Sequence, residues 1–270
     1  MSTTQTARDV SSASIVLDPH LERGREGGPR FGLLLPAGDR GCEADLASMA
    51  RGSGIDLHVS RVGQACGKAK CCESSSALAG LSDRLDDAAA LLPSGGGGLD
   101  VVGYACASGT AVSGLKKIAA KVHAVHPDAE VTTPLEAAIH ALKSLGVERI
   151  AAVLPYRQDI SQLILSFLRV GGIETVSWAC FGLDDDEDMG RIAPETLVEA
   201  VRHVDDPAAE AVLVLGTALR TADLVDELET SVGKPVVTSN QALWWHATSL
   251  MGGAEPVAGF GSLLSRPRPN

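Results

Sequence analysis

Short apolar runs alternate with helical patterns from residue 30 onwards, and this alternation restricts the chain to an α/β fold. Several runs are continuously apolar, which is typical of strands that are covered on both faces. Strands separated by helices predict parallel sheets with right-handed crossovers. The predicted strands cover residues 30–35, 55–61, 99–105, 130–133, 149–154, 175–180, 211–215 and 235–238.

Helical patterns lie between the predicted strands. The clearest covers residues 134–145, where Pro134 suits the first helical turn and Gly146 ends the helix. Similar patterns occur at 196–204 and 221–232.

The eight predicted strands divide into two similar sets of four. The first set opens at Phe31 and reaches Pro36, and the second opens at Arg149 and reaches Pro155. In each set the third strand runs into a turn of small residues. These turns lie at Cys106, 70 residues after Pro36, and at Gly216, 61 residues after Pro155. The spacing favours an internal duplication, although any two α/β segments share some of these features.

Charge and composition argue against several classes of partner. The formal net charge of −11 repels phosphate backbones and anionic lipid, so we expect neither nucleic acid nor a membrane as a partner. Aromatic residues make up only 3% of the chain, which argues against stacking platforms for bases or sugars. No apolar run approaches the length needed to span a bilayer. Residues 1–28 resemble no signal peptide, and we predict a mobile tail and a cytoplasmic protein.

Cys106 is the candidate reactive residue. It follows an apolar strand at the carboxyl end of a predicted parallel sheet, where such sheets bind their ligands. The residues after it are small and suit a helix start, whose N–H groups would point at the sulfur or at a bound carboxylate. The same field favours the thiolate, which is the reactive form of cysteine. A buried and inert cysteine fits the same pattern, and the local sequence does not decide between the two.

The remaining cysteines and histidines form no strong metal motif. Cys66, Cys71 and Cys72 lack the second pair or the histidines that zinc sites usually supply. His123 and His126 are expected to be exposed residues near the end of a helix. The acidic run at 184–188 is typical of a solvated loop, and it lacks the residues of an EF-hand.

Two stretches carry a resemblance to a known family. Asp100-Val-Val-Gly-Tyr-Ala-Cys106-Ala-Ser-Gly-Thr110 resembles the first cysteine motif of the maleate isomerase and arylmalonate decarboxylase branch of the aspartate/glutamate racemase superfamily. The segment at 216–221, with the block at 233–246, is most similar to the ectoine-utilisation A proteins and maleate isomerases. The resemblance implies two pseudo-symmetric parallel four-stranded α/β domains with the site between them. We expect a first domain at 29–133 plus 242–270 and a second at 134–241.

The resemblance also implies roles for single residues, in a reaction that uses no cofactor and no metal. Cys106 matches the cysteine that acts as nucleophile or proton carrier, and Ser108 lies in the turn that binds a substrate carboxylate. Tyr156 matches a tyrosine that hydrogen-bonds the substrate. Thr217 follows the position of the second family cysteine.

Four departures from the family pattern alter these expectations. Gly216 stands where the second cysteine is expected, and Ala107 replaces the usual threonine. Asp39 aligns with an asparagine, and Asp186 aligns with a second one. An ionised aspartate repels a substrate carboxylate, whereas an asparagine can donate to it. If Asp39 lines the pocket, it is either protonated or faces a substrate that carries an ammonium group.

We therefore predict a cofactor-independent isomerase, similar to maleate cis-trans isomerases or racemases, that acts through one cysteine on a small carboxylic acid or amino acid. Ectoine breakdown is one context that fits the resemblance. A single-cysteine decarboxylase of a malonate-type acid is the alternative enzyme. A binding protein without catalytic activity and a thiol redox protein built on Cys66–Cys72 stay open, as does a homo-oligomer.

Overall fold

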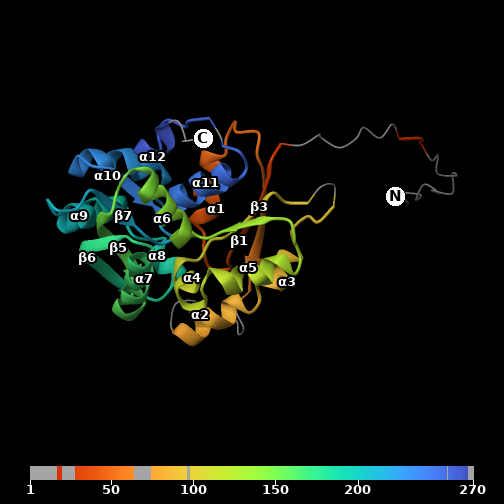
Figure 1. The fold of residues 1–270 in the computed structure, drawn as a ribbon, viewed down its shortest axis with the longest axis horizontal. Coiled ribbons are helices and arrows are strands. Elements are labelled where there is room, and N and C mark those ends of the chain that lie inside the picture. The colour runs from red at the N-terminus through yellow and green to blue at the C-terminus, as the bar shows by residue number, and fades with distance from the viewer. Residues whose placement is uncertain (1–16, 20–27, 64–73, 96–97, 254, 267–270) are drawn as a thin grey trace, which may run out of the picture.

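The computed structural model describes residues 17–19, 28–63, 74–95, 98–253 and 255–266. The first of its two four-stranded sheets has the order β2-β1-β3-β4, and the second has the order β6-β5-β7-β8 (Figure 1). Every strand pairing in these sheets is parallel. The predicted α/β class with two similar four-stranded halves is therefore confirmed. The strands are β1 (Arg30–Pro36), β2 (Asp56–Val62), β3 (Val101–Tyr104), β4 (Glu130–Thr132), β5 (Arg149–Tyr156), β6 (Glu174–Leu183), β7 (Ala211–Val214) and β8 (Val236–Thr238).

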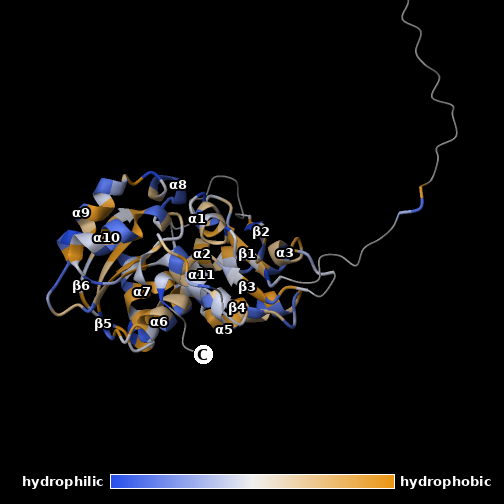
Figure 2. Cartoon of the chain, turned by 90° about the horizontal axis from the view of Figure 1, so that it is seen from above, coloured by the Kyte–Doolittle hydropathy of each residue, from blue (hydrophilic) through white to orange (hydrophobic). Residues whose placement is uncertain are grey.

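Helices connect the strands and cover both sheets (Figure 1). In Figure 2, helices α9 and α10 carry both hydrophobic and hydrophilic colours, as expected of helices with one face in the core. The helices are α1 (Cys42–Met49), α2 (Ser75–Ser82), α3 (Leu85–Ala89), α4 (Ala107–Ser113), α5 (Leu115–His123), α6 (Pro134–Ser144), α7 (Gln158–Val170), α8 (Asp186–Met189), α9 (Pro194–Val204), η1 (Ala222–Leu224), α10 (Val225–Val232), α11 (Ser239–Leu250) and α12 (Gly261–Ser265).

Local chemistry sets the ends of helix α6 as the sequence predicts. The Thr133 side chain accepts a hydrogen bond from the N–H of Glu136, and Pro134 occupies the first turn. Gly146 follows the helix with a φ of +74°, a backbone conformation that favours glycine.

Helix α11 lies between the two sheets and contacts both halves of the molecule. It begins directly after β8 with a capping box formed by Thr238 and Gln241. Its residues from Ser239 to Thr248 are all buried, and it packs against α6, α1, β3 and β4. The ring of Trp244 lies 6.3 Å from that of Phe31 on β1. Helix α11 thus packs against elements of both expected domains, and the domain boundaries stay a prediction.

Two expectations concern the ends of the chain and the membrane. The predicted tail at 1–28 falls almost wholly outside the described residues. Within the described part of the chain, no helix combines the length and the apolar character needed to cross a bilayer.

A stack of the buried His246 on the exposed His140 joins α11 to α6, and His246 also contacts β4. The His246 ring stacks on the ring of His140, with centroids 4.5 Å apart and an interplanar angle of 12°. His246 Nδ1 lies 2.8 Å from the Thr132 hydroxyl. Burial, together with the neighbouring His140, lowers the pKa of His246 to about 4. The fold therefore favours the neutral form of this histidine.

This shift predicts a specific loss of stability in acid. In the unfolded chain a histidine titrates near pH 6.5, so the unfolded state takes up the proton first as pH falls from about 6.5 to about 4. We expect His246 to cost about 2 kcal/mol of unfolding free energy across that window. Urea unfolding at pH 7 and pH 4.5 measures the loss. A His246→Asn protein should lose less than the parent over this interval, whereas a variant of the exposed histidine, His203→Asn, should behave as the parent; equal losses in all three would contradict the assignment.

Candidate functional site

Cys106 lies at the junction between strand β3 and helix α4. Strand β3 ends at Tyr104, and Cys106 is the N-cap residue of α4, in an extended conformation. Its sulfur accepts a hydrogen bond from the N–H of Gly109 at 3.2 Å. The Ser108 hydroxyl lies 3.6 Å from the same sulfur. The Cys106 sulfur therefore lies at the N-terminus of a helix, where backbone N–H groups stabilise a thiolate.

Gly109 makes this close approach of backbone to sulfur feasible. A Cβ at position 109 would lie 2.9 Å from the Cys106 Sγ and 2.7 Å from the Tyr104 hydroxyl oxygen. Both distances are shorter than a carbon atom tolerates, so a side chain here would displace the sulfur. Ala107 and Ser108, the first two residues of α4, are buried beside it.

Asp39 occupies the turn after β1, the strand next to β3. Its Oδ1 accepts hydrogen bonds from the N–H groups of Gly41 at 2.9 Å and Cys42 at 3.0 Å, at the start of α1. Burial raises the pKa of the Asp39 carboxyl, and these N–H groups, the Thr217 hydroxyl and the Arg61 guanidinium partly offset the rise. The same contacts are those of a helix cap, so a structural role accounts for Oδ1 without any ligand.

Thr217 joins the second half of the molecule to the cysteine turn. Its hydroxyl donates to the carbonyl oxygen of Ala105, the residue before Cys106, at 3.2 Å. The same hydroxyl lies close enough to the Asp39 carboxyl to lower its pKa. The structure thus brings together the turns that carry Asp39, Cys106 and Thr217, although they are far apart in sequence.

Gly216 lies in the turn after β7, opposite the cysteine turn, and has no room for a side chain. Its φ is +137°, a conformation that favours glycine, and its N–H donates to the Ser239 hydroxyl at 2.8 Å. A Cβ at this position would lie 2.6 Å from Cγ of Pro155. The position where the family resemblance expects a second cysteine is therefore closed to any side chain in this backbone.

The other candidates surround these turns. Tyr156 is the last residue of β5, is buried, and follows the proline that blocks position 216. Asp186 is buried at the start of α8, and a Cβ at Gly38 would lie 3.5 Å from its Oδ2. A Cβ at Gly41 would collide with the Ala218 carbonyl oxygen. The glycine at 41 thus lets the first half approach the second, whereas position 38 has room for a Cβ.

Sequence reasoning missed two buried polar residues beside this site. Asp45, on α1, and Asn240, on α11, hydrogen-bond each other and the backbone that follows Thr217. Asn240 falls in the block at 233–246 that carries the family resemblance, which was the one signal available for it. Nothing in the local pattern around Asp45 separates it from a surface acid on a helix.

The remaining titratable candidates are structural or lie outside the described residues. Cys66, Cys71 and Cys72 are outside them. The expectation that His126 is exposed is wrong, because it is buried with its Nε2 2.9 Å from the Ala89 carbonyl oxygen. His123 Nε2 lies 3.0 Å from the carbonyl oxygen of Ala129. In the part of the chain that the structure describes, no group of three or more His, Cys, Asp or Glu residues could hold a metal ion.

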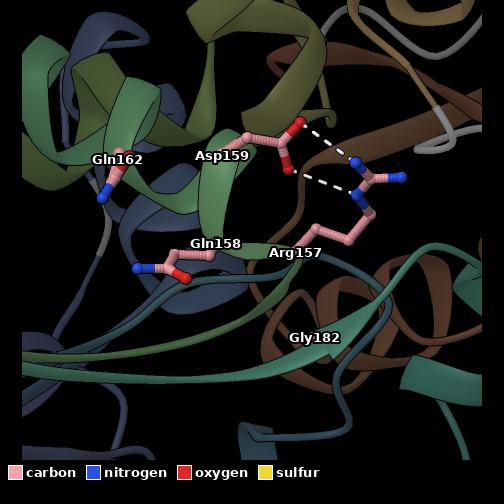
Figure 3. Close-up of a pocket in the computed structure, with 5 residues that line it drawn as sticks. All are labelled: Arg157, Gln158, Asp159, Gln162 and Gly182. Carbon is pink, nitrogen blue, oxygen red and sulfur yellow. Dashed lines mark hydrogen bonds and ion pairs between the residues drawn. The ribbon is translucent and has the colours of Figure 1, made fainter.

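An open pocket of about 640 Å³ lies beside the start of α7, where no site was predicted (Figure 3). Its lining residues are Arg157, Gln158, Asp159, Gln162 and Gly182. The Arg157 guanidinium faces the Asp159 carboxylate, with hydrogen bonds of 3.2 and 3.3 Å. None of the predicted site residues lines this pocket.

The geometry at Gly216 predicts that a second cysteine cannot simply be restored. We expect Gly216→Cys to lower the unfolding free energy by about 2 kcal/mol or more, because it strains the backbone and displaces Pro155. Chemical denaturation measures the change. Gly80→Ala is the matched control, since Gly80 lies within helix α2 with open space around it and alanine is the better helix former there. A Gly216→Cys protein as stable as the parent would show that the turn accepts a side chain.

Comparison with known proteins assigns the chain to a family. The family model described as arylmalonate decarboxylase matches residues 75–264. Arylmalonate decarboxylase from Bordetella bronchiseptica is 32% identical over 136 residues, which is 49% of this chain and 57% of that enzyme, so the match spans little more than half of the relative. Maleate isomerase from Pseudomonas putida is 29% identical over 176 residues, 62% of this chain and 70% of that enzyme.

Solved structures show the same fold at lower identity. The maleate isomerase Iso from Pseudomonas putida S16 has a TM-score of 0.78 at 20% identity, covering 88% of this chain and 98% of that one. A Nocardia farcinica maleate cis-trans isomerase variant with a covalently bound succinylcysteine intermediate has a TM-score of 0.78 at 21% identity, with the same coverage. The extent of the family match settles the assignment: the chain belongs to the arylmalonate decarboxylase family.

Proposed function

We propose that the protein is a cofactor-independent isomerase that acts on a small unsaturated carboxylic acid through Cys106. The observation that carries the proposal is the Cys106 sulfur at the start of α4, where it accepts the Gly109 N–H at 3.2 Å. The maleate isomerases among its relatives support this choice of reaction, and the succinylcysteine intermediate of the Nocardia farcinica variant supports a bond between a cysteine sulfur and a substrate carbon.

The proposed reaction needs one thiolate and no redox partner. The Cys106 sulfur forms a bond to one alkene carbon of a maleate-like acid, and the π electrons move onto the adjacent carboxylate as an enediolate. The former double bond is now single and rotates. The carbon–sulfur bond then breaks, its electrons restore the double bond in the trans form, and the thiolate is regenerated.

The proposed oxyanion stabilisation comes from donors around the cysteine turn. The N–H groups of Ala107 and Ser108 belong to the first turn of α4, where helix N–H groups lack partners within the helix. The Ser108 hydroxyl and the Tyr156 phenol are the proposed side-chain donors to the substrate. Thr217, whose hydroxyl donates to Ala105, is proposed to contribute its backbone N–H. Buried donors stabilise developing negative charge more strongly than donors in water do.

The proposed reaction needs only one thiol, which agrees with the glycine at position 216. Gly216 offers no acid or base, so no proton carrier faces Cys106 from the position of the second family cysteine. Addition, rotation and elimination transfer no proton to carbon, and the absent residue is not needed.

Decarboxylation of a malonate-type acid is the second candidate, favoured by the family match over residues 75–264. Loss of carbon dioxide leaves a planar enediolate, and the Cys106 thiol would then protonate one carbon. This reaction also requires a single cysteine. The two candidates differ in their products, which are a trans isomer or carbon dioxide and a monoacid.

We also propose a substrate class and a cellular context for the enzyme. Asp39, Asp45 and Asp186 place three buried acidic side chains around the meeting turns. A substrate that carries an ammonium group as well as a carboxylate suits such a setting, and a diamino acid from ectoine breakdown is one example. The net charge of −11 and the free thiols of Cys42, Cys106 and Cys180 support a cytoplasmic protein without a nucleic-acid or membrane partner.

Substrate incubation tests the proposal directly. Purified protein is incubated with maleate, substituted malonates and diamino acids, and products are followed by NMR. We expect a cis-to-trans conversion that falls at least about a thousandfold in Cys106→Ser, because the nucleophile is lost. Cys180→Ser is the matched control, a half-buried cysteine on β6, and it should keep the parent's rate.

The alternative functions give different outcomes in the same assay. Release of carbon dioxide, abolished by Cys106→Ser, would replace the isomerase proposal with the decarboxylase. Tight binding without turnover, unaffected by Cys106→Ser, would identify a binding protein. Activity that survives Cys106→Ser but is lost in Cys71→Ser would identify a thiol redox protein.

A further inference from the structure

The turn after β7 lies directly against the cysteine turn, which carries Ala105 and Cys106. Thr217 donates to the carbonyl oxygen of Ala105, and Gly41 packs against the carbonyl oxygen of Ala218. Cys106 is 4% exposed, Ser108 1% and Thr217 5%. The segment at 216–222, here called the Thr217 turn, therefore lies against the cysteine turn in a part of the molecule that is withdrawn from solvent.

One carboxylate holds the far end of the Thr217 turn. Oδ2 of Asp45 accepts hydrogen bonds from the N–H of Thr221 at 3.1 Å, the N–H of Ala222 at 3.2 Å and the Thr221 hydroxyl at 3.4 Å. Asp45 lies on α1, which follows β1 in the other half of the chain. These contacts therefore link the first half of the molecule to the second.

One amide holds the near end of the same turn. Nδ2 of Asn240 donates to Asp45 Oδ2 at 2.9 Å, to the Thr217 carbonyl oxygen at 3.0 Å and to the Leu219 carbonyl oxygen at 3.4 Å. All three partners are acceptors, so the side chain must present its NH₂ group and not its oxygen. Asn240 thus links the carboxylate on α1, the Thr217 turn and helix α11 at one point.

We infer that Asp45 and Asn240 are positioning residues, which hold the Thr217 turn against the cysteine turn and so limit access to Cys106. The inference rests on the proposed function of Cys106. Both side chains are buried, and charge-assisted hydrogen bonds to a buried carboxylate are strong, so the closed arrangement is well defined. Their hydrogen bonds reach the turn from Thr217 to Ala222 and leave the strands and the sulfur itself untouched.

The test measures access to the sulfur and not turnover. Folded protein is treated with iodoacetamide, and alkylation of each cysteine is followed by peptide mass spectrometry. We expect Asn240→Ala and Asp45→Asn to raise the alkylation rate of Cys106 by at least about tenfold, because local opening sets the rate at a buried site. Thr221→Val, which removes only the hydroxyl contact at 3.4 Å, should give a smaller increase.

Two internal references keep the result interpretable. Asp226→Asn alters another carboxylate that accepts a backbone N–H, from Gly261 at 2.8 Å, and should leave the Cys106 rate unchanged. Cys42 is fully buried and is not among the hydrogen-bond partners of the Asn240 side chain, so its alkylation in Asn240→Ala reports general unfolding. In Asp45→Asn general unfolding is measured by urea denaturation instead, because the Asp45 charge itself raises the pKa of Cys42. An unchanged Cys106 rate in Asn240→Ala and Asp45→Asn would overturn the inference. A rise in Cys106 alkylation that Cys42 matches would also overturn it, because the contact would then be a general stabilising one.

This readout also separates the inference from the proposed function. Alkylation depends on access to the thiol and not on any substrate. If Cys106→Ser leaves catalysis intact, the proposed function fails while the labelling result still decides whether Asp45 and Asn240 hold the turn.

Discussion

The hydrogen bond from the Thr217 hydroxyl to the Ala105 carbonyl oxygen joins the turn after β7 to the turn after β3. Its formation requires the backbones of the two halves to come close, and small residues permit this. Gly41 packs against the carbonyl oxygen of Ala218, and Gly216 packs against Pro155. Larger residues at these positions would separate the halves or strain the turns. The arrangement of Cys106, Asp39 and Thr217 depends on this contact, because no single sheet could bring the three together.

The close approach of backbone segments also determines the chemistry of the site. Gly109 lets its N–H reach the Cys106 sulfur, and Gly216 leaves the opposite turn without a side chain. One turn therefore presents a sulfur in a field that favours the thiolate, and the other presents only hydrogen-bond donors. The proposed reaction runs through an enediolate and uses this one cysteine. The acidic residues Asp39, Asp45 and Asp186 are buried around the same two turns.

The sequence predicted the two four-stranded halves because buried parallel strands leave continuous apolar runs that are easily recognised. It also predicted that Cys106 lies between a strand and a helix, since strand ends and small-residue turns are local features. The predicted helix at 221–232 is instead divided, with η1 at Ala222–Leu224 and α10 starting at Val225. Asp45 binds the N–H groups of Thr221 and Ala222 at this point, and its position far away in sequence leaves no local signal. Pro155 on β5 likewise fills the space that a side chain at position 216 would need. This contact between β5 and the turn after β7 leaves no trace in the sequence pattern.

The central claim is that one thiol acts on carbon without a proton carrier opposite it. Turnover of maleate in deuterium oxide, with deuterium counted in the recovered trans acid by NMR and mass spectrometry, tests this claim most directly. Addition, rotation and elimination at Cys106 predict a product without carbon-bound deuterium. Deuterium in the product at levels that grow with turnover would show that a second group protonates the intermediate, and would contradict the account.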